Sequence, residues 1–272
     1  MKIGVFDSGV GGLTVLRELL RVVPAASYSY LGDTARLPYG SKSAATVARY
    51  AASSSKFLVD HGAELMVIAC NTATALALDE IKHAASVPVI GVVEPGASAA
   101  AAITRTGNVD VIGTAATVAS HAYAKSLHAK GIEATEKACP LFVPLVEEGW
   151  IDHPVTEQVA RIYLEELQLF GPLENVERER RPDVLLLGCT HYPLLEPLLR
   201  RLVPRQISLV DSAASTAQVV AKEVRALDQA TAKIGATEIQ FFATDSVEKF
   251  RALGERFLGK RIDKVELISL PE

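Results

Sequence analysis

The fold of this chain is indicated by the stretch Glu64-Leu-Met-Val-Ile-Ala-Cys70-Asn-Thr-Ala73, whose pattern returns in Asp183-Val-Leu-Leu-Leu-Gly-Cys189-Thr-His-Tyr192. In each, an acidic residue precedes an apolar run, a small residue, a cysteine and polar residues that can begin a helix. Uninterrupted apolar runs of this length are typical of strands buried on both faces. A weaker repeat pairs Ile3–Ser8 with Val111–Thr114. The repetition predicts two related halves, each with a cysteine at the same strand end and both facing one cleft.

Short aliphatic segments alternate with helix-length segments along the whole chain. The predicted strands are Lys2–Phe6, Ser27–Leu31, Glu64–Ala69, Pro88–Val93, Val109–Gly113, Ile132–Ala138, Asp183–Gly188, Ile207–Val210 and Glu238–Ala243. The predicted helices are Leu13–Val23, Ser43–His61, Thr72–Ala85, Thr117–Lys130, Thr156–Phe170 and Thr216–Ala226. This alternation predicts an α/β fold with mostly parallel sheets flanked by helices. Ligands of such folds bind beyond the carboxyl ends of the strands, so functional residues are expected there.

The composition excludes several classes of protein. Of the 272 residues, 49% are hydrophobic and 22% charged, which excludes general disorder. The net charge is -4, whereas a protein that binds duplex nucleic acid normally has an excess of basic residues. Three cysteines are too few for a disulfide framework in a chain of this length. No apolar run reaches the ~20 residues of a membrane helix, and no apolar core of a signal peptide follows Met1. We therefore expect a cytoplasmic protein with no nucleic-acid or membrane partner.

Cys70 and Cys189 are the first candidates for chemistry. A thiol between a strand and a helix lies near unpaired backbone N–H groups, which favour the thiolate and lower the thiol pKa. Thr72 and Thr190 are the expected caps of the following helices. The matching contexts favour a catalytic role over that of two small buried hydrophobic residues. Cys139 precedes Pro140 without such a repeat and is expected to be a buried structural residue.

Asp7 and Ser8 follow the first predicted strand and precede the glycine-rich turn Gly9–Gly12. The backbone N–H groups of such a turn can bind a phosphate or a carboxylate. The turn has neither the third glycine of a dinucleotide-binding motif nor the Lys-Ser/Thr of a P-loop. The alternative for Asp7 is a simple cap of the helix Leu13–Val23.

His191 lies two residues after Cys189, where it can exchange a proton with the thiol. It could instead join Cys189 as a metal ligand, but no second Cys/His cluster lies nearby to complete a tetrahedral site. The loop from Gly32 to Ser41 is rich in hydrogen-bond donors. It is either a functional loop or an ordinary turn.

Six motifs in register resemble the glutamate racemase family. They are Gly4–Val15, Gly32–Gly40, Ala69–Ala73, Gly91–Pro95, Phe142–Glu147 and Gly188–Leu195. They run in order between about residues 2 and 215, and the remaining tail is similar in character only.

This resemblance implies a racemase that needs no cofactor or metal and interconverts L- and D-glutamate, supplying D-glutamate for peptidoglycan. It implies two similar α/β domains with the active site in the cleft between them, in a homodimer. Partly guided by it, we expect residues 1–96 with 211–272 to form the first domain and residues 97–210 the second.

The family's catalytic cysteines fall on Cys70 and Cys189, assisted by residues that fall on Asp7 and His191. The family's auxiliary acid falls on Glu147, with the adjacent Glu148 as the alternative. Substrate contacts fall on Asp7, Ser8, Pro38, Tyr39, Gly40, Ser41, Asn71, Thr72, Thr190 and His191.

Two thiols suit this reaction, because inverting Cα requires proton removal on one face and delivery on the other. Three alternatives remain open. One is a related enzyme such as an aspartate racemase. Another is a non-catalytic α/β module that binds phosphate or nucleotide through Gly9–Gly12. The third is a metal-binding protein that uses Cys189 and His191.

Overall fold

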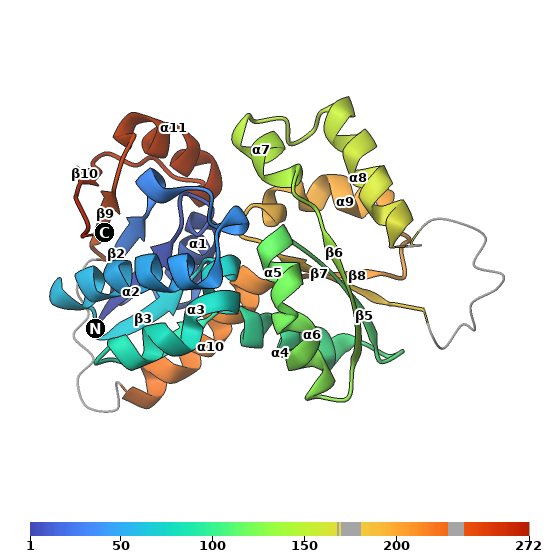
Figure 1. Cartoon of the computed structure of the whole chain (residues 1–272), viewed down its shortest axis with the longest axis horizontal. Helices are drawn as coiled ribbons and strands as arrows, with labels where there is room; N and C mark the ends of the chain where they lie inside the picture. The colour runs from blue at the N-terminus through green and yellow to red at the C-terminus, as the bar shows by residue number, and fades with distance from the viewer. Residues whose placement is uncertain (168, 170–180, 228–236, 272) are drawn as a thin grey trace. The chain divides into compact units, whose positions relative to one another are not determined.

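The computed structural model describes residues 1–167, 169, 181–227 and 237–271 (Figure 1). The chain divides into two compact units, Met1–Val92 with Ala213–Glu272, and Val93–Ser212. Each unit is built around one parallel sheet.

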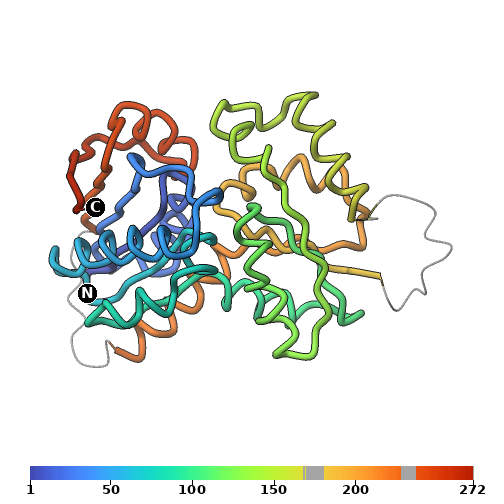
Figure 2. The backbone as a smooth tube through the Cα atoms, in the orientation of Figure 1, coloured from blue at the N-terminus to red at the C-terminus, as the bar shows by residue number. Residues whose placement is uncertain are grey.

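The first sheet has six parallel strands in the order β10-β9-β2-β1-β3-β4. Its strands are β1 (Lys2–Asp7), β2 (Ser27–Gly32), β3 (Leu65–Ile68), β4 (Val89–Gly91), β9 (Ile239–Ala243) and β10 (Glu266–Leu267). Pairing of β9 with β2 brings the C-terminal part of the chain beside the N-terminal strands, as the red and blue traces of Figure 2 show.

The second sheet has four parallel strands in the order β6-β5-β7-β8. They are β5 (Asn108–Gly113), β6 (Glu133–Ala138), β7 (Val184–Gly188) and β8 (Ser208–Asp211). This order matches β2-β1-β3-β4 of the first sheet strand for strand. The repeated stretches of the sequence fall on β3 and β7, and the weaker repeat falls on β1 and β5. The expected fold class, two mostly parallel sheets flanked by helices, is confirmed.

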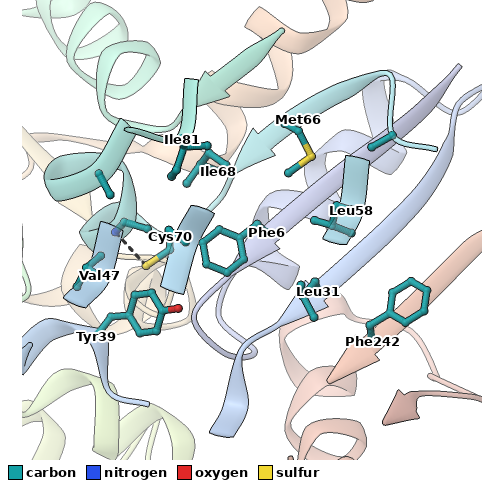
Figure 3. Close-up of a cluster of buried hydrophobic side chains, with 14 residues drawn as sticks. Phe6, Leu31, Tyr39, Val47, Leu58, Met66, Ile68, Cys70, Ile81 and Phe242 are labelled. Carbon is teal, nitrogen blue, oxygen red and sulfur yellow. Dashed lines mark hydrogen bonds between the residues drawn. The ribbon is translucent and has the colours of Figure 1, made fainter. Parts of the chain in front are cut away.

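Helices cover both faces of the first sheet. Helices α2 (Ala44–Asp60) and α3 (Asn71–Ala84) pack on one face, where Phe6, Leu31 and Met66 meet apolar residues of both helices (Figures 1 and 3). On the other face lie α1 (Leu13–Val22) and α11 (Val247–Leu258). There Phe250 packs on Tyr30 with ring centroids 5.9 Å apart. Sequence-distant helices therefore hold the strand ends that carry Asp7 and Cys70.

The remaining helices differ from prediction in several places. They are α4 (Val93–Ile103), α5 (Ala115–Ser120), α6 (Ala122–His128), α7 (Phe142–Glu147), α8 (Pro154–Glu166), α9 (Glu196–Leu202) and α10 (Ser212–Leu227). The helix predicted over Thr117–Lys130 is interrupted at His121, whose φ of 54° is left-handed. Helices α4, α7, α9 and α11 were not predicted. The predicted end of one helix at Phe170 lies outside the described residues.

The unit boundaries also differ from the expected domains by a few residues. Residues 93–96, expected in the first domain, begin α4, and Glu94 pairs with Lys130 of the second unit at 2.5 Å. Residues 211–212 likewise fall in the second unit, because Asp211 is the last residue of β8, which pairs with β7. Within the described ranges, no helix is long and apolar enough to cross a membrane.

Candidate active site

Asp7 and the two predicted catalytic cysteines lie at the carboxyl ends of strands in the two sheets. In the first sheet, β2 lies on one side of β1 and β3 lies on the other. The order in which the chain adds strands to the sheet therefore reverses between β1 and β3. Asp7 ends β1, and Cys70 follows β3 by two residues. In the second sheet β5 and β7 are the equivalent strands, and Cys189 directly follows β7. Both cysteines thus lie where parallel α/β sheets bind ligands.

Cys70, Ser8 and Asp7 form what we call the first half-site. The Sγ atom of Cys70 lies 3.4 Å from Oγ of Ser8. It also accepts the backbone N–H of Ala73 at 3.4 Å, the dashed line in Figure 3. Cys70 itself therefore caps α3, which corrects the expectation that Thr72 would be the cap. Asn71 and Thr72 are buried in the first turn of this helix.

The ionisation of Cys70 is opposite to the expectation from its place at a helix start. Burial and the neighbouring Asp7 carboxylate raise the pKa of the Cys70 thiol to about 12. Hydrogen bonds with Ser8 and Ala73 lower this pKa, but their effect is smaller. The helix-end N–H groups are too few to offset the loss of water around a buried thiolate. In the free protein Cys70 is therefore a thiol, which suits a proton donor.

The glycine-rich turn lies directly over these strand ends. Asp7 Oδ2 accepts the N–H of Gly9 at 2.9 Å, and the capping position of α1 is Gly12, so Asp7 is not a simple helix cap. A Cβ atom on Gly12 would lie 2.6 Å from Cβ of Asp7 and 2.8 Å from Cβ of Ala69. Only glycine lets the turn pass this close to β1 and β3.

The loop after β2 carries four more expected substrate contacts, and it is held by a residue that we did not select from the sequence. The hydroxyl of Tyr39 donates to Oδ2 of Asp33 at 2.5 Å. Asp33 is fully buried and also accepts from Arg36 and Thr244, each at 2.9 Å. A signal was available, because Asp33 directly follows β2 much as Asp7 ends β1.

The side chain of Tyr39 is therefore bound within the loop, in the same apolar cluster as Cys70 (Figure 3). Burial and Asp33 raise the pKa of its phenol, which keeps the hydroxyl a donor. Pro38, Gly40 and Ser41 flank it on the loop, with Tyr39–Ser41 forming a short 3₁₀ helix. Their exposed or half-buried positions leave the loop backbone available to a ligand.

Cys189, Thr190, His191 and Glu147 form what we call the second half-site. His191 is hydrogen-bonded to the side chain of Cys189, and its Nε2 lies 3.2 Å from Oε1 of Glu147. Its Nδ1 lies 3.4 Å from Oγ1 of Thr190. Glu147 ends α7, whereas the adjacent Glu148 is exposed to solvent, so Glu147 is the acid that contacts His191.

The charge of His191 follows from these contacts. Burial lowers the pKa of the imidazole, but the hydrogen bonds to Cys189 and Glu147 outweigh it and raise the pKa to about 10. At neutral pH His191 is an imidazolium and a donor to the Cys189 sulfur. Thr190 is not a helix cap as expected, since the chain turns into the 3₁₀ helix η5 (Tyr192–Leu195), for which His191 has the capping position.

Cys139 lies at the end of β6 and is completely buried. Burial raises the pKa of its thiol to about 12 despite the nearby Lys137. In the described part of the chain, no three His, Cys, Asp or Glu side chains are grouped to hold a metal ion.

Comparison with known proteins places this geometry in a family. The model of the family described as Asp/Glu/hydantoin racemase matches residues 3–220. The chain belongs to this family. This racemase is 57% identical to the glutamate racemase of Koribacter versatilis, over 98% of its own length and 97% of the relative.

Two solved structures are also similar to the racemase. The glutamate racemase of Francisella tularensis in complex with D-glutamate has a TM-score of 0.88 and 35% identity, covering 98% of this chain and 97% of that one. The Escherichia coli glutamate racemase in complex with L-glutamate and the activator UDP-MurNAc-Ala has a TM-score of 0.78 and 27% identity, covering 100% and 99%. An amino-acid racemase is an isomerase, so the racemase must exchange the hydrogen at a stereocentre between two faces.

Proposed function

We propose that the protein is a cofactor-independent glutamate racemase that interconverts L- and D-glutamate and supplies D-glutamate for peptidoglycan. The observation that carries the proposal is the equivalent placement of Cys70 and Cys189 after strands β3 and β7, which have the same position in two sheets of the same strand order. Full-length similarity to glutamate racemases, including structures with D- and L-glutamate bound, supports glutamate as the substrate.

The proposed reaction is a proton transfer at Cα by two bases. One cysteine thiolate removes the Cα proton and becomes a thiol, while the other cysteine, a thiol, gives its proton to the opposite face and becomes a thiolate. The number of protons and the total charge on the pair are unchanged. Two opposed groups are needed because one group would return the proton to the face from which it came.

The two half-sites favour one starting state. The His191 imidazolium is a donor to the Cys189 sulfur, whereas Cys70, whose pKa is raised to about 12, is a thiol that can give up a proton. Following the family resemblance, we assign Cys189 as the base for L-glutamate, and Cys70 then protonates the other face to give D-glutamate. The reverse reaction starts from the other arrangement of the same proton, with Cys70 as thiolate.

The substrate is held by neutral donors in this proposal. Backbone N–H groups of the Gly9–Gly12 turn, with the side chains of Ser8, Asn71, Thr72 and Thr190, bind the carboxylates and stabilise the charge that develops at Cα. The loop Pro38–Ser41 supplies further contacts to the substrate in this proposal. Because the Cα–H is only weakly acidic without an electron-sink cofactor, these electrostatic contacts carry much of the rate.

The decisive experiment is an assay of the purified protein by circular dichroism with L- and D-glutamate, in parallel with both aspartate enantiomers. After exhaustive dialysis against a chelator, we expect unchanged racemisation of glutamate and slower turnover of aspartate. A preference for aspartate would favour the aspartate racemase alternative. Saturable nucleotide binding without racemisation would favour the non-catalytic module, and recovery only with added metal or pyridoxal phosphate would contradict the cofactor-independent mechanism.

We also propose that the enzyme acts in the cytoplasm as a homodimer, as the family resemblance implies. Analytical ultracentrifugation at enzyme concentrations used in the assay tests the dimer, and a monomer at those concentrations contradicts it.

A further inference from the structure

Tyr192 is a buried residue that the proposed mechanism does not use. It is completely buried, and its ring packs edge-on against Phe142, with centroids 5.2 Å apart and an interplanar angle of 85°. Its hydroxyl lies 3.0 Å from the carbonyl oxygen of Gly113 and 2.9 Å from that of Cys139. One side chain therefore contacts the ends of both β5 and β6.

These contacts connect the two segments that supply the second half-site. Tyr192 directly follows His191, and its backbone N–H donates to the carbonyl of Cys189 at 3.1 Å. Cys139 begins the segment that leads into α7, whose last residue is Glu147. The Tyr192 hydroxyl thus joins the segment of Cys189 and His191 to the segment of Glu147.

The hydroxyl is not required to satisfy either carbonyl. The Gly113 carbonyl also accepts the N–H of Cys139 at 2.9 Å, and the Cys139 carbonyl accepts the N–H of Phe142 at 3.2 Å. Removing the hydroxyl would therefore leave no buried carbonyl without a donor, which limits the cost in stability. What it would remove is the restraint on the relative position of the two segments.

That restraint matters because the hydrogen bond between His191 and Glu147 is already long. Nε2 of His191 and Oε1 of Glu147 are 3.2 Å apart, at the long end of N–H···O hydrogen bonds. A small shift of η5 against α7 would break this contact.

We propose that Tyr192 is a positioning residue, whose hydroxyl fixes the segment of His191 against α7 so that the contact between Glu147 and His191 is kept beside Cys189. The catalytic consequence of this role rests on the proposed function. The effect on His191 itself does not, since it follows from the contacts within the second unit.

The test compares Tyr192→Phe with Tyr28→Phe. Tyr28 is a matched control, because it is also completely buried and its hydroxyl also contacts two backbone carbonyls, those of Val23 at 2.7 Å and Leu19 at 3.2 Å. Its contacts lie at the end of α1 and join no half-site residues.

The first readout is the titration of His191 by NMR of histidine-labelled protein, which needs no racemase activity. We expect the His191 titration to move to lower pH in Tyr192→Phe and to stay unchanged in Tyr28→Phe. An unchanged His191 titration in Tyr192→Phe overturns the proposal even if the wild type is a glutamate racemase. If the wild type does not racemise glutamate, the proposed function fails while this readout still decides the role of Tyr192.

The second readout is kinetic. In Tyr192→Phe we expect kcat to fall roughly tenfold, as for a small displacement of a catalytic group, with the alkaline limb of the pH profile moved to lower pH. In a Glu147→Gln background the same substitution should have a much smaller effect, because the contact it protects is already lost. Full additivity of the two substitutions contradicts the proposal.

Phe142→Leu is a second variant that tests the proposal if Tyr192→Phe does not fold. This substitution keeps the Tyr192 hydroxyl but removes the ring packed against it, so we expect the same shift of the His191 titration with smaller size. If Tyr192→Phe gives no cooperative thermal transition, an unshifted His191 titration in folded Phe142→Leu overturns the proposal.

Discussion

Oε1 of Glu147 lies 3.2 Å from Nε2 of His191, an ion pair between residues 44 positions apart in the chain. Both side chains are largely buried, at 20% and 10% exposure, so solvent screens the pair weakly. The pair keeps a positive charge on His191, which is hydrogen-bonded to the side chain of Cys189. A histidine near a thiol thereby acts as a fixed cation at neutral pH instead of a group that titrates there.

Replacement of Glu147 by Gln tests this relationship. Glu147 is one of the causes that raise the His191 pKa to about 10, so its removal lowers that pKa. We expect the alkaline limb of kcat/KM to move to lower pH. On that limb, lowering the pKa of His191 by one reduces the fraction of His191 that is imidazolium about tenfold. The measurement is kcat/KM against pH in both directions, which must agree because the equilibrium constant of racemisation is one.

The same pair contributes to stability with a defined pH window. The folded pKa of His191 lies above its ordinary value of 6.5, so this contribution is complete below about pH 6.5 and is lost as the pH rises through about 10. Thermal unfolding of Glu147→Gln should show a smaller loss that is complete at lower pH than in the wild type, because the folded pKa of His191 is lower. Identical pH profiles of Tm in the two proteins would contradict the ion pair.

Alanine substitutions separate the three cysteines. Cys70→Ala and Cys189→Ala each remove a proposed acid/base group, so racemisation should fall by roughly 10²–10⁴-fold or more. Cys139→Ala removes only a buried apolar group, and we expect a lower Tm with near-normal kcat. A folded Cys139→Ala protein that is as inactive as the other two would show that the assignment is wrong.

Isotope exchange assigns each thiol to a face. Cys189→Ala retains Cys70, which can remove a proton and return a deuteron to the same face, so in deuterated water it should slowly label D-glutamate without inverting it. Cys70→Ala should label L-glutamate instead. Proton NMR of the α-position follows both reactions. Exchange of the same enantiomer by both variants is incompatible with two opposed thiols.

Asp110 on β5 should make folding less favourable at neutral pH. Burial raises the pKa of its carboxyl from 3.8 to about 7, and no donor among the described residues reaches its Oδ2. The folded state therefore binds a proton more tightly than the unfolded chain, and stability falls as the pH rises from about 4 to 7. We expect Asp110→Asn to flatten this dependence and to gain roughly 1–3 kcal/mol at pH 8, measured by urea unfolding.

Asp183, in the same unit, is the matched control for Asp110. Burial raises the pKa of its carboxyl, but hydrogen bonds from Thr104, Arg105 and Thr106 outweigh this and lower the pKa. Its contribution is present above about pH 3.8 and is lost as the pH falls, so Asp183→Asn should destabilise the protein at pH 8. A gain in stability for both variants would contradict the assigned environments.

The parts of this protein that were predictable are those encoded by local pattern. The apolar runs before Cys70 and Cys189 specify buried strands, and their repetition matches the equivalent positions of β3 and β7. The helix break at His121 was not predictable, because a left-handed histidine depends on contacts elsewhere. Helix α4 was not predicted, although Pro95 lies in its first turn, where the missing N–H of proline costs nothing.

Side-chain ionisation was the least predictable property. The sequence places Cys70 at a helix start, which favours a thiolate, but burial and the Asp7 carboxylate reverse the direction. Both effects depend on how closely β1 and β3 pair, and on the helices that exclude water from their ends. The contact between Glu147 and His191 likewise depends on the packing of α7 beside η5, which no local pattern encodes.

The pairing of β9 with β2 has a consequence for synthesis on the ribosome. The first unit is assembled from two separate stretches, so its sheet lacks β9 and the edge strand β10 until Glu266 and Leu267 have emerged. The second unit is one continuous stretch, Val93–Ser212, and has all of its residues earlier. Since domains generally fold as units during translation, the domain begun first is the one completed last.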